Sequence, residues 1–559
     1  MHDLVIKNGL VVDGSGRDGE LADVAIDGDV IVSVGTDVGP ARRQIDAAGQ
    51  VVSPGFIDGH THMDAQVMWD AAGSCSCYHG VTTVVMGNCG FTVAPVQPGK
   101  EELVVRNLER AEDMPSEALA AGIDWSWETF PQYLDAVDKR PKGINYAGYI
   151  GHSALRTWAM GERAFSEAAS EDDLARMEDA LRQALQAGAV GLSTTRNDNH
   201  ATSDDRPVAS RLASWGEVRR LVHAVGEEGG IFELTRERLA LDDENHDSGA
   251  RLRALAVESG TAVTFGAMRM EALSLIDSIN QAGGTAFGQC HSRGIMGLAT
   301  FEGELPFDQL PKWRDVRALG LAGQREAFSS PDTRGELVEI ASRGEFREAR
   351  GAEQPPPDYE AMMLYDTPLP PRRTVADVAR ERGVSPVEAM IDLALETDFR
   401  QLFMQPLVPV SEPDLLALLR HPGCVMTFSD AGAHVGQISD CSLATYLLAY
   451  WVRARKEFTL AEAVQMITST PARRWGLTRR GLVREGFVAD LNVFDPDRIT
   501  PNVPEVTFDL PAQSRRFHQT AEGISTTIVG GIPSLVAGEQ TGDFPGRLLR
   551  RQDRVGGVQ

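Results

Sequence analysis

Cysteine is scarce in this chain, and the signals of secretion and membrane insertion are missing. The 559 residues include only six cysteines, which are scattered and follow no spacing typical of a secreted disulfide framework. No apolar stretch approaches the roughly 20 residues that span a bilayer. The N-terminus, residues 1–7, lacks the basic start, long apolar core and small-residue cleavage site of a signal peptide. We therefore predict a cytoplasmic protein with no membrane partner.

Positive charge is also scarce. The chain holds 54 lysines and arginines against 80 aspartates and glutamates, which leaves a formal net charge of −26. An acidic exterior repels the phosphates of nucleic acids, so we expect no nucleic-acid partner. A local cationic pocket can coexist with that exterior, and a small-molecule substrate therefore remains open, as does assembly into a homo-oligomer. The hydrophobic fraction of 42% is ordinary for a globular protein.

Both ends of the chain have the pattern of short strands joined by turns. In residues 1–52, the pairs Asp13-Gly14 and Asp27-Gly28 separate apolar runs, which is a strong hairpin signal. Residues 479–545 hold a second set of strand-like runs. Neither set can close a core alone, so we predict a small β-sandwich built from both chain ends. Residues 546–559 are rich in arginine, and we expect a loose tail there.

The middle of the chain, residues 53–478, alternates strand-like apolar runs with amphipathic helical stretches. Eight parallel strands with intervening helices form a (β/α)8 TIM-type barrel, so the predicted fold class is α/β, with the active site at the carboxyl ends of the strands. Residues 296–378 contain proline clusters that cannot continue a helix, and we interpret them as an insertion, or lid, over the barrel mouth. The predicted strands are 51–57, 82–86, 145–150, 189–192, 230–234, 261–265, 284–288 and 424–428.

Two histidines one residue apart follow the first predicted strand. In an extended segment, residues i and i+2 point to the same side, so His60 and His62 present their imidazoles to one point. Imidazole is the commonest protein ligand for zinc and related metals. The alternative is a pair of histidines in a polar loop. The apolar run before them and the acidic residue after them favour a metal site.

Two further strand ends carry groups that suit the same metal. Asp430 ends the eighth strand, which neighbours the first in a closed barrel. Its carboxylate could bind the metal or take a proton from metal-bound water and pass it to a leaving nitrogen, although a helix N-cap is the structural alternative. Cys89 lies in a glycine-flanked turn after the second strand, where a plain buried thiol is the alternative.

Other strand ends offer candidate substrate contacts. His152 follows the third strand and either contacts substrate or is a satisfied structural histidine. A guanidinium binds a carboxylate bidentately, so the arginines after strands four to six could clamp an acidic substrate, with surface exposure as the alternative. His291, after the seventh strand, is the last candidate, whereas we interpret His434 as structural. The three candidate arginines are Arg196, Arg236 and Arg269.

These residues resemble the amidohydrolase superfamily and, more narrowly, the D-aminoacylase (N-acyl-D-amino-acid deacylase) family. The Asn88-Cys89-Gly90 turn is what points to this branch. The resemblance implies a barrel with a small β-sandwich, a metal ligand at Cys89, a catalytic acid/base at Asp430, and a second metal position lined by His60 and His62. The matching stretches are 52–62, 80–83, 87–90, 151–152, 188–194, 429–430, 481 and 486–495.

The chain departs from the family at two strands. The family also places one metal-binding histidine at the fifth strand and one at the sixth, but residues 231–237 and 262–269 contain none. A two-metal mechanism is therefore disfavoured, and we expect one Zn²⁺ per chain, with Glu233 or His291 as open substitutes for the missing ligands. The predicted metal ligands are His60, His62, Cys89 and Asp430.

Three functions remain open from the sequence. The first is metal-dependent hydrolysis of a non-peptide carbon–nitrogen bond in an N-acyl-D-amino acid or related N-acyl small molecule. The second is hydrolysis of a cyclic amide, imide or lactone on the same scaffold. The third is a metal-free, non-catalytic barrel that acts as a binding module. The four predicted ligands favour the first function, and the missing histidines favour the third.

Overall fold

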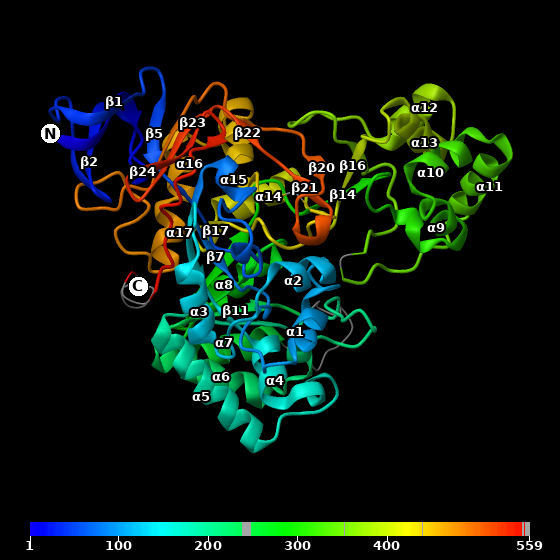
Figure 1. Ribbon diagram of the computed structural model, residues 1–559, viewed down its shortest axis with the longest axis horizontal. Coiled ribbons are helices and arrows are strands. Elements are labelled where there is room, and N and C mark those ends of the chain that lie inside the picture. The colour runs from blue at the N-terminus through cyan, green and yellow to red at the C-terminus, as the bar shows by residue number, and fades with distance from the viewer. Residues whose placement is uncertain (238–247, 352, 439, 551–552, 554–559) are drawn as a thin grey trace.

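The two ends of the chain form one mixed sheet. The computed structural model describes residues 1–237, 248–351, 353–438, 440–550 and 553. The sheet has nine strands, and its central pair joins the two ends, because β5 runs antiparallel to β18 (Figure 1). Buried apolar residues from both ends share its core, among them Ile6, Val24, Leu491 and Ile528. The strands are β1 (His2–Val11), β2 (Glu20–Asp27), β3 (Val30–Gly35), β4 (Ala41–Asp46), β5 (Val51–Pro54), β18 (Leu491–Phe494), β23 (Ile524–Val529), β24 (Ile532–Val536) and β25 (Glu539–Gln540).

The apolar run predicted as one strand over 51–57 belongs to two sheets. β5 stays in the terminal sheet, whereas β6 (Phe56–Asp58) pairs in parallel with β7 (Val81–Met86). Gly55 separates the two strands, and a Cβ atom there would lie 2.1 Å from Oγ1 of Thr82. Only glycine allows the chain to pass this close to β7, so the first parallel strand begins beside the terminal sheet.

The remaining central strands are parallel and alternate with helices. β6, β7 and β8 (Asn145–Gly148) form one sheet, and six more strands form a second, with only Tyr149 between β8 and β9. Each predicted strand of the middle segment has a counterpart within a few residues of its expected bounds, but 51–57 and 145–150 are each divided between two sheets. The second sheet runs β17 (Cys424–Met426), β13 (Thr285–Cys290), β12 (Ala262–Gly266), β11 (Ile231–Thr235), β10 (Gly191–Thr195) and β9 (Ile150–Gly151).

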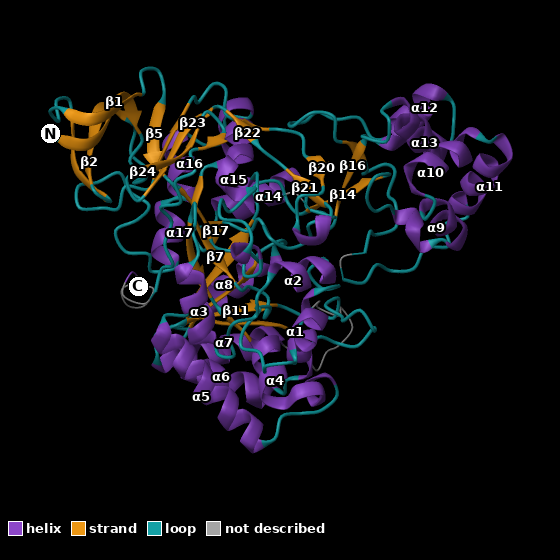
Figure 2. Cartoon of the chain, in the orientation of Figure 1, coloured by secondary structure: helices purple, strands orange, loops and turns teal. Residues whose placement is uncertain are grey.

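Amphipathic helices lie around these strands (Figure 2). Three helices, α1, α2 and α3, lie between β7 and β8, and α4 to α8 lie between the strands that follow. None of the described helices is long and apolar enough to cross a membrane. The bounds are α1 (Glu101–Leu108), α2 (Ser116–Gly122), α3 (Phe130–Lys139), α4 (His152–Met160), α5 (Glu171–Ala187), α6 (Trp215–Glu227), α7 (Ser248–Ser259), α8 (Glu271–Gln281), α14 (Glu412–Arg420), α15 (Leu443–Tyr446), α16 (Leu460–Ile467) and α17 (Ser469–Arg474).

A separate unit lies between β13 and β17 and projects to the right in Figure 1. Its own core surrounds Trp313, which is fully buried among the rings of Phe301, Phe307 and Phe328. The unit continues past residue 378, because β16 pairs with β14. Its elements are β14 (Met296–Thr300), α9 (Pro311–Arg317), α10 (Gly320–Ser329), α11 (Pro331–Ser342), β15 (Met363–Leu364), α12 (Val375–Arg382), α13 (Pro386–Glu396) and β16 (Leu402–Pro406).

The expectation of a loose tail from residue 546 is wrong for the part that the structure describes. Leu548 and Leu549 are buried, and the tail pairs with Tyr146 of β8. The Tyr146 N–H donates to the carbonyl of Arg547, and the Leu549 N–H donates to the carbonyl of Tyr146. This edge of β8 is open because β8 pairs only with β7 among the named strands. Residues 551–552 and 554–559 lie outside the described residues.

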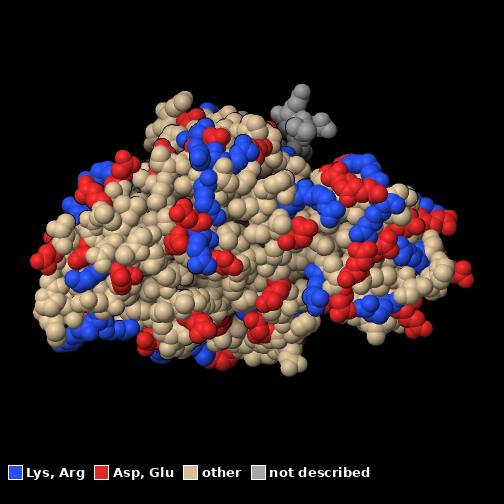
Figure 3. Space-filling model, turned by 90° about the horizontal axis from the view of Figure 1, so that it is seen from above, with Lys and Arg blue, Asp and Glu red and all other residues tan. Residues whose placement is uncertain are grey.

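The surface carries both signs of charge. On the face seen in Figure 3, acidic and basic side chains are interspersed over the main body and the inserted unit. Many form ion pairs, such as Arg382 with Glu396 at 2.7 Å and Arg106 with Glu162 at 2.7 Å. The excess of acidic residues therefore gathers into no continuous patch on this face.

Candidate metal centre

The turn after β6 is held by the residues that directly follow β17. Asp58, the final residue of β6, accepts hydrogen bonds through Oδ1 from the His60 N–H at 3.1 Å, the Thr427 hydroxyl at 3.1 Å and the Phe428 N–H at 3.2 Å. The carboxylate is buried, so these bonds replace its hydration. The ends of β6 and β17 are thereby fixed side by side.

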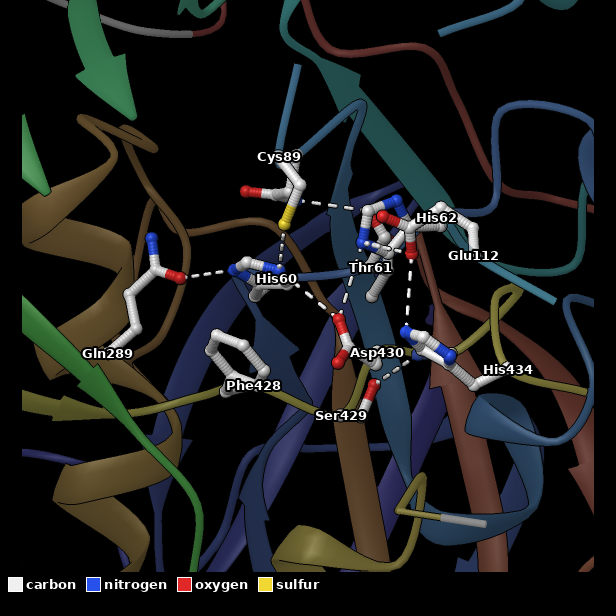
Figure 4. A network of polar contacts seen from close by, with 12 residues as sticks. His60, Thr61, His62, Cys89, Glu112, Gln289, Phe428, Ser429, Asp430 and His434 are labelled. Atoms are coloured by element: carbon white, nitrogen blue, oxygen red, sulfur yellow. Dashed lines mark hydrogen bonds and ion pairs between the residues drawn. The ribbon is translucent and has the colours of Figure 1, made fainter. Parts of the chain in front are cut away.

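The structure brings together all four predicted metal ligands (Figure 4). Nε2 of His60 lies 3.2 Å from Oδ1 of Asp430, and Nε2 of His62 lies 3.3 Å from the same oxygen. The Cys89 sulfur lies 3.4 Å from Nε2 of His60. Ligand atoms of His60, His62 and Cys89 are all within 4.8 Å of one another. All four residues are buried, so their donor atoms converge away from bulk water.

Asp430 is held in the cluster by the backbone and is not a helix cap. Its φ angle of 54° is left-handed, and its N–H donates to the carbonyl of His60 at 3.2 Å. The His62 N–H donates to the carbonyl of Ala431 at 2.8 Å. The next helix, α15, begins only at Leu443. The N-cap alternative for Asp430 is therefore wrong.

Cys89 occupies a strained turn that the fifth strand supports. Its φ angle is 56°, and its N–H donates to Oε2 of Glu233 on β11 at 2.7 Å. The next N–H, that of Gly90, donates to the Ser193 hydroxyl on β10 at 3.0 Å. This left-handed conformation costs free energy in a non-glycine residue, so the conformation persists only where neighbouring contacts fix it. These two bonds aim the thiol at His60.

The sixth and seventh strands orient His60. The carbonyl oxygen of Gln289 on β13 accepts from Nδ1 of His60, and its amide donates to the Thr264 hydroxyl on β12 at 3.0 Å. A carbonyl oxygen only accepts, so Nδ1 carries the proton and Nε2 presents its lone pair to the cluster. The ring also stacks on Phe428, with centroids 3.8 Å apart. The fifth and sixth strands lack histidine, but their side chains hydrogen-bond to the residues that hold the ligands: Glu233 bonds to Cys89, and Thr264 bonds to Gln289.

Sequence reasoning missed two residues beside the cluster. Glu112 lies in the loop after α1, and its Oε2 is 3.5 Å from Nε2 of His62 and 3.4 Å from Nε2 of His434. Glu112 gave no signal, because it lies in no strand-end pattern. His434, which we interpreted as structural, lies four residues after Asp430 in the same loop. That closeness to Asp430 was the available signal in the sequence.

Burial sets the charge of the ligands. Burial alone would raise the pKa of Asp430, but contact with His60 and His62 holds that pKa well below its usual range. Burial lowers the pKa of His62 to about 4 against the opposing effect of Asp430. At neutral pH the aspartate is therefore ionised and His62 is neutral, which are the forms that bind metals.

The cluster lacks a balancing cation among the described residues. Burial raises the pKa of Glu233 to about 7 and raises the pKa values of Glu112 and Cys89 well above their usual range. Within the described chain, no lysine or arginine forms an ion pair with Glu112, Glu233 or Asp430. Four acidic groups that converge in this way fit a divalent metal ion, which neutralises them and lowers their pKa values.

Of the two alternatives for His152, a substrate contact and a satisfied structural histidine, the contacts favour the second. Its Nδ1 lies 2.9 Å from the Thr194 hydroxyl, and its Nε2 lies 2.9 Å from Oε1 of Glu217. The same glutamate pairs with the fully buried Arg156. Both ring nitrogens are occupied, so no donor is left for a ligand.

His291 also stands apart from the cluster. Its Nε2 contacts the carbonyl of Asp440 at 3.2 Å, and its Nδ1 accepts from the Arg293 N–H at 3.1 Å. These contacts close the turn after β13. The structure therefore gives His291 no part in the metal centre and no free donor for substrate.

The three candidate arginines differ in surroundings. Arg196 pairs with Glu237 and also donates to the carbonyl of Ala213 at 3.0 Å. Arg269 is exposed. Arg236 directly follows β11, is half-buried, and lies 5.2 Å above the ring of Phe265. Burial lowers the pKa of Arg236 from its ordinary 12.5. Among the described residues, no carboxylate forms an ion pair with Arg236.

Histidine, thiolate and carboxylate donors at the ends of parallel strands define a class of metal-binding α/β hydrolases. Within that class, the chain belongs to the amidohydrolase family, whose model matches residues 43–533 and so includes every residue of the cluster. It is a hydrolase of carbon–nitrogen bonds other than peptide bonds and acts on small molecules.

Similar proteins match nearly the full chain. D-aminoacylase from Alcaligenes xylosoxydans xylosoxydans is 28% identical over 556 residues, which is 98% of each chain. A second relative is a D-aminoacylase structure from work on its binuclear metal centre, described as one-metal activation and second-metal attenuation. It superposes on this chain with a TM-score of 0.65 at 25% identity, over 99% of this chain and 100% of that one. N-acyl-D-glutamate deacylase from Bordetella bronchiseptica, complexed with zinc and a phosphonate inhibitor, shares the fold with a TM-score of 0.63 at 24% identity, over 98% and 99%.

Proposed function

We propose that this protein hydrolyses the amide bond of an N-acyl-D-amino acid or a related N-acyl small molecule, with one Zn²⁺ and with Asp430 as general acid/base. The observation that carries the proposal is the convergence of His60, His62 and Cys89 on an ionised, buried Asp430. The 28% identity to a D-aminoacylase over almost the whole chain supports the substrate class.

We further propose that the parallel strands close into a (β/α)8 barrel. The hydrogen-bonded strand order supports closure, as does a parallel bridge between Thr61 and Ala431, which lie just beyond β6 and β17. Closure puts His60, Cys89 and Asp430 at the carboxyl ends of their strands, where barrels of this kind carry out their chemistry.

The metal would be held by His60, His62, Cys89 and Asp430. When bound, such an ion polarises an amide carbonyl and brings the pKa of water to about 7. Asp430 takes the proton of the attacking water and transfers it to the amide nitrogen. The carbon–nitrogen bond then breaks, the amino acid leaves as an amine and the acyl group leaves as a carboxylate. Gln289 keeps the proton of His60 on Nδ1, away from the reacting atoms.

An N-acyl amino acid brings its own carboxylate, and Arg236 is the residue we propose to bind it. Its guanidinium directly follows β11, the strand that carries Glu233. Among the described residues Glu271 acts on it electrostatically, but no carboxylate forms an ion pair with it. Arg196 is neutralised by Glu237, and Arg269 is exposed. A half-buried guanidinium without a carboxylate partner offers the bidentate geometry that an acidic substrate requires.

The test is the Asp430→Asn variant, assayed on a panel of N-acyl-D-amino acids with mass-spectrometric identification of products. We expect turnover to fall roughly 10²–10⁴-fold, with thermal stability retained. Asp497→Asn, an exposed carboxylate in the turn after β18, is the matched control. Wild-type turnover in Asp430→Asn contradicts the proposed acid/base. A single ring-opened product in place of an acid and an amine would move the substrate to the cyclic amides.

A further inference from the structure

We propose that Glu112 and His434 form, together with His62, a second cation position beside the first. This inference rests on the proposed function, because the second position takes His62 from the ligands of the first. Neither Glu112 nor His434 lies at a strand end, so this position comes from loops of this chain.

The spacing of the donor atoms is that of ligands around one ion. Oε2 of Glu112 is 3.5 Å from Nε2 of His62 and 3.4 Å from Nε2 of His434, and Oδ1 of Asp430 is 3.3 Å from the same His62 nitrogen. Bonds of about 2.0–2.2 Å at tetrahedral angles separate their ligand atoms by about 3.3–3.6 Å. These three distances therefore match the spacing of ligands around one ion.

The donors from Glu112, His62 and Asp430 have no hydrogen-bond partner among the described residues. Both carboxylate oxygens of Glu112, both ring nitrogens of His62 and Oδ1 of Asp430 are buried without a hydrogen bond. Contacts of 3.3–3.5 Å that are not hydrogen bonds mean that the atoms face a shared point and not each other. Buried polar atoms are almost always satisfied, so an ion is the missing partner.

The two loops that carry the new ligands are clamped together. The His434 N–H donates to the carbonyl of Glu112 at 2.5 Å, and the Gly436 N–H donates to Oδ2 of Asp113 at 2.8 Å. Glu112 is 1% exposed. The pair is thus part of a built site and not a chance meeting of surface side chains.

The position of His62 determines how the ligands are divided between the two ions. It faces Asp430 and Glu112 at nearly equal distances, so it serves the first ion when one is bound and the second when two are bound. The first position then keeps His60, Cys89 and Asp430. The second has only nitrogen and oxygen donors, so it accepts harder cations such as Mn²⁺ or Co²⁺, whereas the thiolate position selects Zn²⁺.

The experiment measures metal content of the whole protein after Zn²⁺ loading and equilibrium dialysis against Co²⁺. We expect two ions per wild-type chain, and one in Glu112→Gln and in His434→Asn. The single ion retained in both variants should be the one bound through Cys89. Glu109→Gln, in the same loop and without an ion pair among the described residues, is the matched control and should keep two.

The outcomes separate the two proposals. One ion in wild type at saturating Co²⁺, unchanged in the variants, overturns the second position and leaves the proposed function intact. If wild type, Glu112→Gln and His434→Asn all bind two ions, the assignment of Glu112 and His434 as ligands is overturned. No ion in any protein overturns the proposed function itself. Circular dichroism of each variant identifies a loss of fold. If one of the two variants does not fold, the other still tests the second position.

Discussion

Individual side chains differ in how far the sequence predicts them. His60, His62 and Asp430 could be found because strand ends in a parallel sheet meet at one edge, so position along the chain translates into position in space. Glu112 could not be found, since its loop meets His434 by contacts that no local pattern encodes. The sequence left His152 open for a related reason: a buried structural histidine and a substrate-binding histidine have the same sequence signature, and only the contact with Glu217 favours the first.

At this scale Gln289 is a positioning residue whose effect can be measured. Gln289→Leu removes the acceptor of the His60 Nδ1 proton, so the ring loses its fixed tautomer. We expect metal affinity to fall roughly 10–100-fold, as for other residues that orient metal ligands. Competition with a chelating dye measures it. Gln401→Leu, a buried glutamine of the inserted unit that donates to the carbonyl of Leu402, should bind metal normally. Equal affinity in the two variants would remove Gln289 from this role.

Arg236 can be tested by substrate kinetics. Arg236→Met keeps the length of the side chain and its packing over Phe265 but removes the charge. We expect kcat/KM for an N-acyl amino acid to fall because the free energy of the transition state rises by roughly 1.5–3 kcal/mol, the contribution of a hydrogen bond to a charged group. The loss should vanish for the corresponding amide, which carries no carboxylate. An equal loss on both substrates would assign Arg236 to packing alone.

At the scale of helices and strands, periodicity was a good guide and boundaries were a weaker one. Residues 171–187, one of the amphipathic stretches of the middle segment, form α5, since apolar residues recur at helical spacing and Ser170 begins the helix with a capping box. The split of 51–57 between two sheets was not foreseen. An apolar run looks the same whether it pairs in one sheet or two, and only the close approach at Gly55 shows the break.

The cap of α5 gives a prediction on stability. The Ser170 hydroxyl accepts from the Asp173 N–H at 3.2 Å, while Oδ2 of Asp173 accepts from the Ser170 N–H at 3.0 Å. Ser170→Ala should lower the free energy of unfolding by about 1 kcal/mol. Chemical denaturation measures it, and Ser126→Ala, outside any helix, should have little effect. An unchanged midpoint for Ser170→Ala would contradict the cap.

The same cap depends on pH. Burial opposes ionisation of Asp173, but Arg163 and Ser170 outweigh it and lower the pKa from 3.8 to about 2. A pKa lowered by folding means that the ionised form stabilises the folded state. The contribution of Asp173 is therefore fully present above pH 3.8 and is lost as the pH falls towards 2. The stability difference between wild type and Asp173→Asn should shrink over that interval.

At the scale of the whole molecule, the sequence predicted a small β-sandwich built from both chain ends, and the strands of both ends do lie together, in one nine-stranded sheet. The packing of the last described residues was not predicted. Paired apolar runs at the two ends signal a shared core, because neither can bury itself alone. The arginines around Leu548 and Leu549 suggested a solvated tail, yet the two leucines are buried and the segment completes the edge of β8. Two apolar residues are too short a run to be recognised without that edge.

The pairing of β5 with β18 has a consequence for synthesis. Val52 pairs with Val493, so the partner strand is made 441 residues later (493 − 52). At roughly 5–20 residues per second, β5 leaves the ribosome about 20–90 s before β18 exists. During that time an apolar sheet edge lacks its neighbour and can attract other nascent chains. We expect the first fifty residues to need a chaperone until translation ends, when the newly made C-terminal strands cover them.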